Sequence, residues 1–159
     1  AVPSRKTGAL IVVTVASFAG WTMVVGAALP DPAHDVDRLY RFLCEASRRV
    51  GEVQYFSMDC VLGFHAWARV REGHVMRAYA WAGRTEWNEG RITPEERVLG
   101  MQCGDYGDEP RLGFVGDSTA EMRNAERVPV LARRWGLDLA AATDALLQSE
   151  SVGLDGAGE

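Results

Sequence analysis

An alternation of apolar and polar residues with a period of two dominates the middle of the chain, from Phe64 to Trp81. This period is typical of β-strands. Two alternating runs flank Arg71-Glu72-Gly73, a loop that has glycine at the position where a positive φ is usually needed. The stretch therefore predicts a β-hairpin with a three-residue loop.

The predicted loop determines which residues of the two strands lie opposite each other. Val70 is expected opposite His74, and Trp67 opposite Arg77. One face then carries small and apolar residues, namely Phe64, Ala66, Ala68, Val70, His74, Met76, Ala78 and Ala80. A slip of one residue would place arginines among the alanines, so the pattern specifies its own register. Small side chains on one face predict that a helix packs closely there.

The opposite face of the predicted hairpin combines aromatic and cationic side chains. Its members are His65, Trp67, Arg69, Arg77, Tyr79 and Trp81. Tryptophan, tyrosine and arginine are enriched at binding hot spots, and arginine beside tryptophan permits cation–π contacts. Two interpretations remain open: this face binds a protein partner, or the C-terminal helices cover it while the arginines reach solvent at its border.

A helical period precedes the hairpin. Apolar residues recur at spacings of three and four at Val36, Leu39, Leu43, Ala46 and Val50. Asp31 is the predicted cap, Pro32 suits the first helical position, and Gly51 ends the helix. This helix is the expected partner of the alanine face.

Shorter elements are predicted on both sides of the hairpin. A strand is expected at Val53–Met58, and Thr93-Pro94-Glu95-Glu96 has the cap, proline and glutamate of a brief helix. The rest comprises a long loop at 101–118, helices from about Ala125 to Trp135 and from Asp138 to Gln148, and an acidic, disordered tail at 149–159.

The segment between Thr7 and Pro30 has no charged residue and is largely apolar. It resembles a signal peptide or a membrane span, but its β-branched residues favour two strands, Ala9–Ala16 and Trp21–Leu29. Together the elements predict an α+β fold. We expect one domain over residues 1–148, with a mainly antiparallel sheet of about five or six strands and one main helix packed on one face.

Composition narrows the function classes. Hydrophobic residues make up 47% of the 159 residues and charged residues 25%, as in an ordinary globular protein. The net charge of -5 argues against a nucleic-acid binder. The three cysteines show no CxxC spacing, which favours reduced thiols in the cytoplasm.

The candidate catalytic groups are few and poorly spaced. Cys60, His65 and Asp59 could form a nucleophile, base and orienting group, but only across a bulged turn. His65 and His74 are expected on opposite faces, so no metal site is predicted, and no cofactor motif is found. Two acidic groups fit solvated surfaces better than calcium binding or glycoside hydrolysis: Asp105, Asp108 and Glu109, and the cluster Glu86, Glu89, Glu95 and Glu96.

Several short segments of the chain resemble segments found in a group of uncharacterised small bacterial α+β proteins. They are Gly20–Gly26, Gly51–Phe56, His65–Arg69, Arg77–Ala80, Glu89–Glu96 and Ala132–Asp138. Some members of that group look like the immunity-type companions of toxin systems. The resemblance implies a soluble bacterial protein and supports two strands before residue 30; it brings no activity and no site residues.

These observations lead to a first hypothesis of a non-enzymatic protein-binding module, an immunity or inhibitor protein. Its partner would be a protein, such as a toxin, contacting the aromatic–cationic face; neither nucleic acid nor membrane is expected. Two alternatives stay open. One is a small enzyme or ligand binder with a pocket between the 64–81 hairpin and the 101–118 loop, and the other is a structural subunit of a larger assembly.

Overall fold

The computed structural model describes residues 14–18, 20–26, 28–108 and 120–148. The chain divides into two compact units, Pro30–Asp138 and a second unit formed by Ala1–Leu29 with Leu139–Glu159. One domain over residues 1–148 stays a prediction. The expected tail at 149–159 and most of the 101–118 loop lie outside the described residues.

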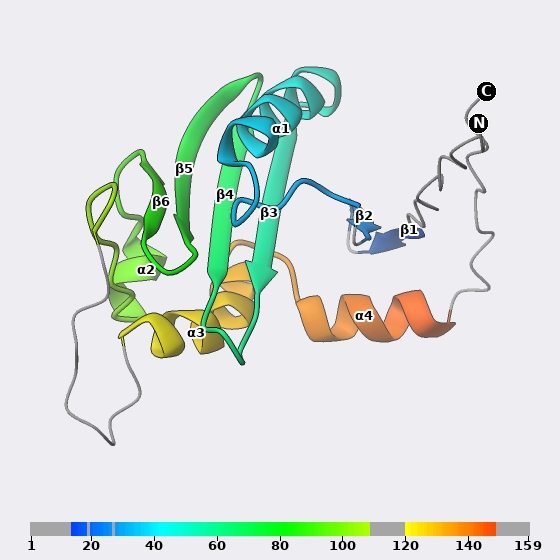
Figure 1. The fold of residues 1–159 in the computed structure, drawn as a ribbon. Helices are drawn as coiled ribbons and strands as arrows, with labels where there is room; N and C mark the ends of the chain where they lie inside the picture. Colours follow the sequence, from blue (N-terminus) through cyan, green and yellow to red (C-terminus); the bar gives the residue numbers. More distant parts are fainter. Residues whose placement is uncertain (1–13, 19, 27, 109–119, 149–159) are drawn as a thin grey trace, which may run out of the picture. The chain divides into compact units, whose positions relative to one another are not determined.

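The larger unit contains a four-stranded antiparallel sheet in sequence order. Its strands are β3 (Glu52–Met58), β4 (His65–Arg71), β5 (His74–Trp81) and β6 (Thr85–Glu89). Helix α1 (Val36–Val50) covers one face, and α3 (Ala120–Arg134) covers the other, with the short α2 (Pro94–Val98) beside it (Figure 1).

The smaller unit holds a two-stranded antiparallel sheet of β1 (Thr14–Phe18) and β2 (Trp21–Val25), together with α4 (Leu139–Gln148), which contacts β1. The predicted strand pair before residue 30 is therefore confirmed with shorter bounds, although residues 9–13 lie outside the described part. Among the described residues, no helix has the length and apolar character needed to cross a bilayer.

The α+β class and the antiparallel pairing are confirmed, but the predicted single sheet of five or six strands is not. The described strands form one sheet of four and a separate pair. Nor is α1 the one main helix, because α3 is also 15 residues long. The sequence pattern identifies strands, but it does not say which strands share a sheet.

The hairpin of β4 and β5 forms as predicted, but its register differs. The loop has two residues, Glu72 and Gly73, with φ of 49° and 81°, as a type I′ turn requires. The extra residue is Met76, which forms a bulge because Val70 pairs with Val75 and Arg69 with Arg77.

The two differences together shift the pairing by two residues, so most side chains keep their predicted face. Trp67 lies opposite Tyr79 rather than Arg77. The alanines, with Val70, form one core with Leu39, Leu43 and Cys44 of α1, as expected. His74 and Met76 leave this face for solvent, Val75 replaces them, and Phe64 packs with the opposite cluster.

Helix α1 begins later than predicted. Asp35, not Asp31, is the cap, and its carboxylate accepts a hydrogen bond from Arg38 N. Asp31 instead accepts from Ala33 N in the preceding turn. The predicted end at Gly51, with φ of 90°, is confirmed. Ser47, buried near this end, accepts a bond from Gly73 N and so ties α1 to the hairpin loop.

The late helices also differ at their starts. Helix α3 begins at Ala120 rather than near Ala125, which places Pro129 in its interior. There the missing N–H leaves the Ala125 carbonyl without its usual helical donor. Helix α4 begins directly after Asp138, in agreement with the prediction.

Candidate functional site

The aromatic–cationic face lies under α3 instead of on a free surface. His65, Trp67, Arg77, Tyr79 and Trp81 are at most 9% exposed, and the aromatic side chains among them pack with Val128, Leu131 and Trp135. Arg69 alone of the six predicted binding residues is partly exposed. The prediction that these residues share one region of the sheet agrees with the structure, but five of them are buried in the core, where a protein partner could not contact them.

His65 is the centre of an aromatic stack. Its ring lies 5.8 Å from the Trp67 and Trp81 rings and 5.9 Å from the Tyr79 ring, measured between centroids. Its Nδ1 lies 2.7 Å from the Gly63 carbonyl, which can only accept, so Nδ1 carries the proton. The other nitrogen, Nε2, then accepts from the Asn124 side chain at 3.4 Å. Burial lowers the pKa of His65, although the Gly63 hydrogen bond opposes this, so the ring is held neutral.

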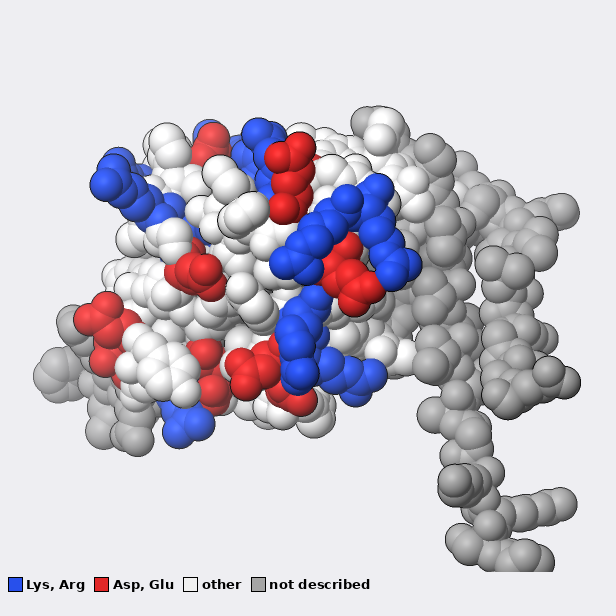
Figure 2. Space-filling model, turned by 90° about the horizontal axis from the view of Figure 1, so that it is seen from above, with Lys and Arg blue, Asp and Glu red and all other residues white. Residues whose placement is uncertain are grey.

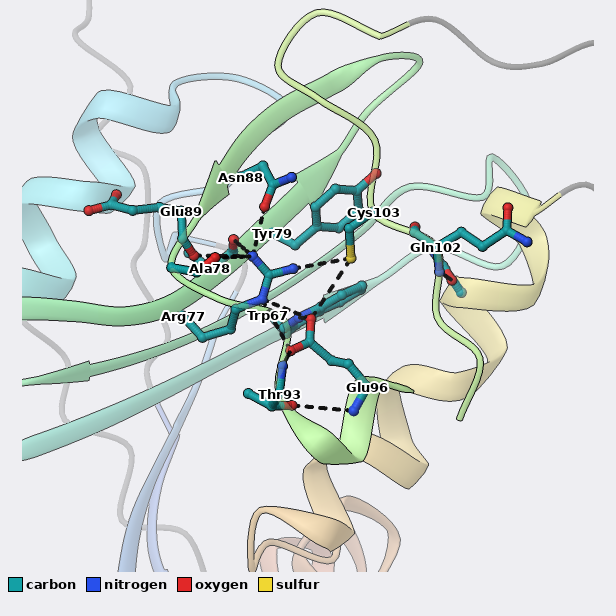
Figure 3. A network of polar contacts seen from close by, with 12 residues as sticks. Trp67, Arg77, Ala78, Tyr79, Asn88, Glu89, Thr93, Glu96, Gln102 and Cys103 are labelled. Carbon is teal, nitrogen blue, oxygen red and sulfur yellow. Dashed lines mark hydrogen bonds and ion pairs between the residues drawn. The ribbon is translucent and has the colours of Figure 1, made fainter. Parts of the chain in front are cut away.

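Arg77 and Glu96 form an ion pair that is almost completely buried, at 1% and 0% side-chain exposure (Figure 3). Arg77 Nε donates to both carboxylate oxygens, at 2.9 and 3.1 Å. Nη1 donates to the Asn88 side chain and to the carbonyls of Ala78 and Glu89. All three guanidinium nitrogens have partners, because Nη2 lies 3.1 Å from the Cys103 sulfur.

Glu96 joins this pair to a helix start. It is the third residue of α2, and its Oε2 accepts from Thr93 N while Thr93 Oγ1 accepts from Glu96 N. This is the predicted capping box. Glu96 Oε1 also accepts from Trp67 Nε1 at 2.9 Å. One carboxylate therefore connects β4, β5 and α2.

The Cys103 thiol completes the network without being activated by it. Burial raises the pKa of Cys103 to about 12, and the neighbouring Arg77 only partly opposes this effect. A thiol with such a pKa is protonated at neutral pH and is a poor nucleophile. Because its polar groups are bonded to one another, we interpret the network as a structural element.

Sequence reasoning missed the role of Glu96. The capping box and the arginine on the sheet are both visible in the sequence, but nothing in the pattern shows that they meet. Glu96 and Arg77 lie 19 positions apart. The available signal was that Arg77 needs an anionic partner once its face is covered, and a nearby glutamate in a capping box offers one.

The other predicted catalytic groups do not assemble. Cys60 is exposed, whereas both nitrogens of His65 are engaged by Gly63 and Asn124. Within the described residues, no group of three or more His, Cys, Asp or Glu side chains could hold a metal ion. Asp108 accepts from Asp105 N inside its own loop, and Glu109 lies outside the described residues.

The surface carboxylates near β6 are likewise paired. Glu86 forms an ion pair with Arg84, and Glu89 accepts from Trp87 Nε1. Together with the burial of Glu96 in its ion pair with Arg77, these contacts engage three of the four glutamates of the predicted cluster.

A small recess lies near the ends of β3 and β5. It has a volume of about 70 Å³ and is lined by Asp31, Pro32, Ala33, Ser57, Asp59, Phe64, His65, Trp81 and Ala82. Pockets for small organic ligands typically measure roughly 300–1,000 Å³. The recess is thus too small for most organic ligands, and it is not at the predicted position between the hairpin and the 101–118 loop.

The turn between β3 and β4 exposes two apolar side chains in a defined conformation. Val61 is 89% exposed and Leu62 58%. Their backbone N–H groups both donate to Asp59 Oδ1 at 2.9 Å, and Asp59 N donates to the Phe64 carbonyl at 2.7 Å. We call Val61 and Leu62 the apolar turn.

Comparison with family models, with curated proteins and with solved structures finds no match to this chain. The functional argument therefore depends on the geometry alone.

Proposed function

We propose that this chain is a non-enzymatic protein-binding module, a cytoplasmic bacterial immunity or inhibitor protein, which holds its partner through the apolar turn. The observation that carries the proposal is the exposure of Val61 and Leu62 on a turn braced by Asp59. A braced turn loses little conformational entropy when it binds, which favours affinity.

The buried polar groups support a non-enzymatic role. An enzyme needs a nucleophile, acid or base that can reach its substrate. Here Arg77 and Glu96 bind each other, His65 is neutral with both nitrogens engaged, and Cys103 has a raised pKa. We therefore interpret these groups as stabilising the fold.

Charge indicates the chemistry of the partner. Asp59 lies in the turn itself and Asp31 lines the neighbouring recess, while the whole chain carries a net charge of -5. A basic protein with an apolar patch would complement this region, and opposite charges would accelerate its association. A basic toxin meets this description.

The test uses the protein encoded beside this chain's gene as the probe. We expect the Val61→Asp/Leu62→Asp double variant to bind that protein about 30-fold more weakly or worse, as for hot-spot residues worth about 2 kcal/mol. Isothermal titration calorimetry measures the affinity. Val98→Asp is the matched control, because Val98 is 70% exposed on α2.

Equal affinity of the double variant and the wild type would contradict the proposal. An equal loss in Val98→Asp would do the same, since it would reflect added negative charge instead of a lost contact. Both variants change exposed side chains, so urea unfolding curves should stay close to that of the wild type.

A further inference from the structure

The two outer edges of the four-stranded sheet differ in how they are covered. At β6, the segment after α2 folds back along the strand. Thr85 N donates to the Asp108 carbonyl at 2.9 Å, and Gly107 N donates to the Thr85 carbonyl at 2.8 Å. The Asn88 side chain adds a bond to the Gly104 carbonyl. At Thr85 and Asn88, the β6 edge is therefore covered by its own chain.

At β3, the hydrogen-bond pattern shows which backbone groups face outward. Two bonds bracket the β3–β4 pairing: Asp59 N to the Phe64 carbonyl, and Glu72 N to the Gly51 carbonyl. Hydrogen-bonded pairs alternate along an antiparallel ladder, so Val53, Tyr55 and Ser57 bond to β4. The N–H and C=O groups of the residues between and beside them point away from β4. These outward residues are Glu52, Gln54, Phe56 and Met58.

Within the larger unit, over residues 30–108 and 120–138, no hydrogen bond reaches these outward backbone groups. The strand also lacks the usual protection of an edge. It contains no proline, lysine or glycine, and its pairing with β4 has no bulge. Both α1 and α3 contact β3, so the described residues of the larger unit cover its two faces but not its outer edge.

We propose that a second copy of this chain adds its own β3 to this edge in an antiparallel, two-fold symmetric pair. If the axis passes beside Tyr55, Glu52 lies opposite Met58 of the second copy and Gln54 lies opposite Phe56. Every outward residue of both copies then falls in a hydrogen-bonded pair.

The charges at the two ends of β3 favour this antiparallel arrangement. At the start of β3, Arg69 and Arg71 both form ion pairs with Glu52. Burial alone would raise the pKa of Glu52, but hydrogen bonds from these arginines lower it to about 2, so this carboxylate stays charged. Figure 2 looks onto this end of the sheet, where Arg side chains gather around acidic ones. At the other end, Asp59 follows Met58. Pairing brings the arginines of one copy toward Asp59 of the other and places no like charges opposite each other.

Symmetry favours a second copy over an unrelated strand. A two-fold interface uses the same surface on both molecules and closes after two. The joined sheet would end in β6 on both sides, and each β6 edge is covered by the 104–108 segment. The pair thereby removes the open edges that invite aggregation.

The experiment is sedimentation equilibrium of the full chain over a wide concentration range. Met58→Pro removes an outward N–H without removing any bond to β4, and Met58→Val, which keeps the N–H, is the matched control. We expect the wild type and Met58→Val to reach the mass of a dimer, and Met58→Pro to dissociate about 10-fold more readily, equivalent to about 1.4 kcal/mol. Dimerisation of Met58→Pro as tight as that of Met58→Val would overturn the proposal, as would a monomeric wild type at millimolar concentration.

Amide hydrogen exchange supplies a second test that does not depend on the variants. In dilute protein, the amides of Gln54, Phe56 and Met58 should exchange fast while those of Val53 and Tyr55 are protected. Raising the concentration should protect the first set. Protection of the first set in a monomer would mean that the chain itself covers this edge, and the proposal would fail.

Discussion

The two faces of the four-stranded sheet are both covered by helices, but different contacts hold them. On the α1 face, Ala68, Ala78 and Val70 meet Leu39 and Leu43, and the cluster is apolar throughout. On the α3 face, aromatic rings surround a buried arginine, a glutamate and a histidine. One face depends on close packing of small side chains, and the other on polar groups that must all find partners.

The difference shows that aromatic and cationic side chains on a sheet can stabilise the fold or bind a partner, depending on whether a helix covers them. Tryptophan and arginine on an open sheet would be a typical binding surface. Under α3, the same side chains need internal partners, because a buried and unpaired charge is very costly. Glu96 fulfils that need by accepting hydrogen bonds from Trp67 and Arg77, and this face is therefore core.

The largest effect should come from breaking the buried ion pair. Arg77→Met leaves the Glu96 carboxylate buried beside Trp67 and Thr93 without its counter-charge. We expect the free energy of unfolding to fall by about 3–5 kcal/mol, as measured by urea denaturation. Arg84→Met removes an exposed ion pair with Glu86 and is the control, with an expected change below about 1 kcal/mol.

The double variant Arg77→Met/Glu96→Leu sharpens this prediction. If burial of an unpaired charge causes the loss, removing both charges should cost less than the two single changes added together. Simple additivity would mean that the two side chains stabilise the protein independently, contrary to our interpretation of Figure 3.

A smaller effect is expected from the α1 face, where volume matters more than charge. Ala78 is fully buried between the sheet and α1, so Ala78→Leu should overpack this layer and cost about 1–3 kcal/mol. Met76→Leu, at the exposed bulge, is the comparison and should have almost no effect. A tolerated Ala78→Leu would show that α1 does not pack closely on the alanines.

The smallest effect concerns pH. The pKa of His65 is lowered in the folded protein, so between the unfolded value of about 6.5 and the lower folded value the unfolded chain binds more protons. Stability should be full above that window and decrease as the pH falls through it. Urea unfolding curves recorded across this pH range give the free energy of unfolding at each pH. We expect this free energy to fall more steeply with decreasing pH in the wild type than in His65→Gln. Parallel pH dependence would show that His65 titrates alike in both states.

The sequence could predict which residues share a face, because alternation with period two survives a shift of two residues. That is why Ala66 and Trp67 lie on their expected sides even though the loop is shorter and Met76 forms a bulge. It could also predict the caps at Gly51 and Thr93, which depend on neighbouring residues alone.

Contacts between distant residues could not be predicted. Coverage by α3 brings Leu131 onto Trp67, far apart in the chain, and the partnership of Arg77 with Glu96 depends on where α2 lies. This is why the residues predicted to form an exposed binding site are buried. The same residue pattern suits a binding surface and a buried face, and only the position of α3 distinguishes the two.

The most direct test of the central claim, that the aromatic–cationic face is structural core, is hydrogen exchange at the Trp67 indole. Its N–H is fully buried and donates to Glu96. The account predicts exchange only through global unfolding, with an opening free energy equal to that from urea denaturation. Exchange within minutes at neutral pH, with native structure intact, would show that this face opens to solvent and would contradict the account.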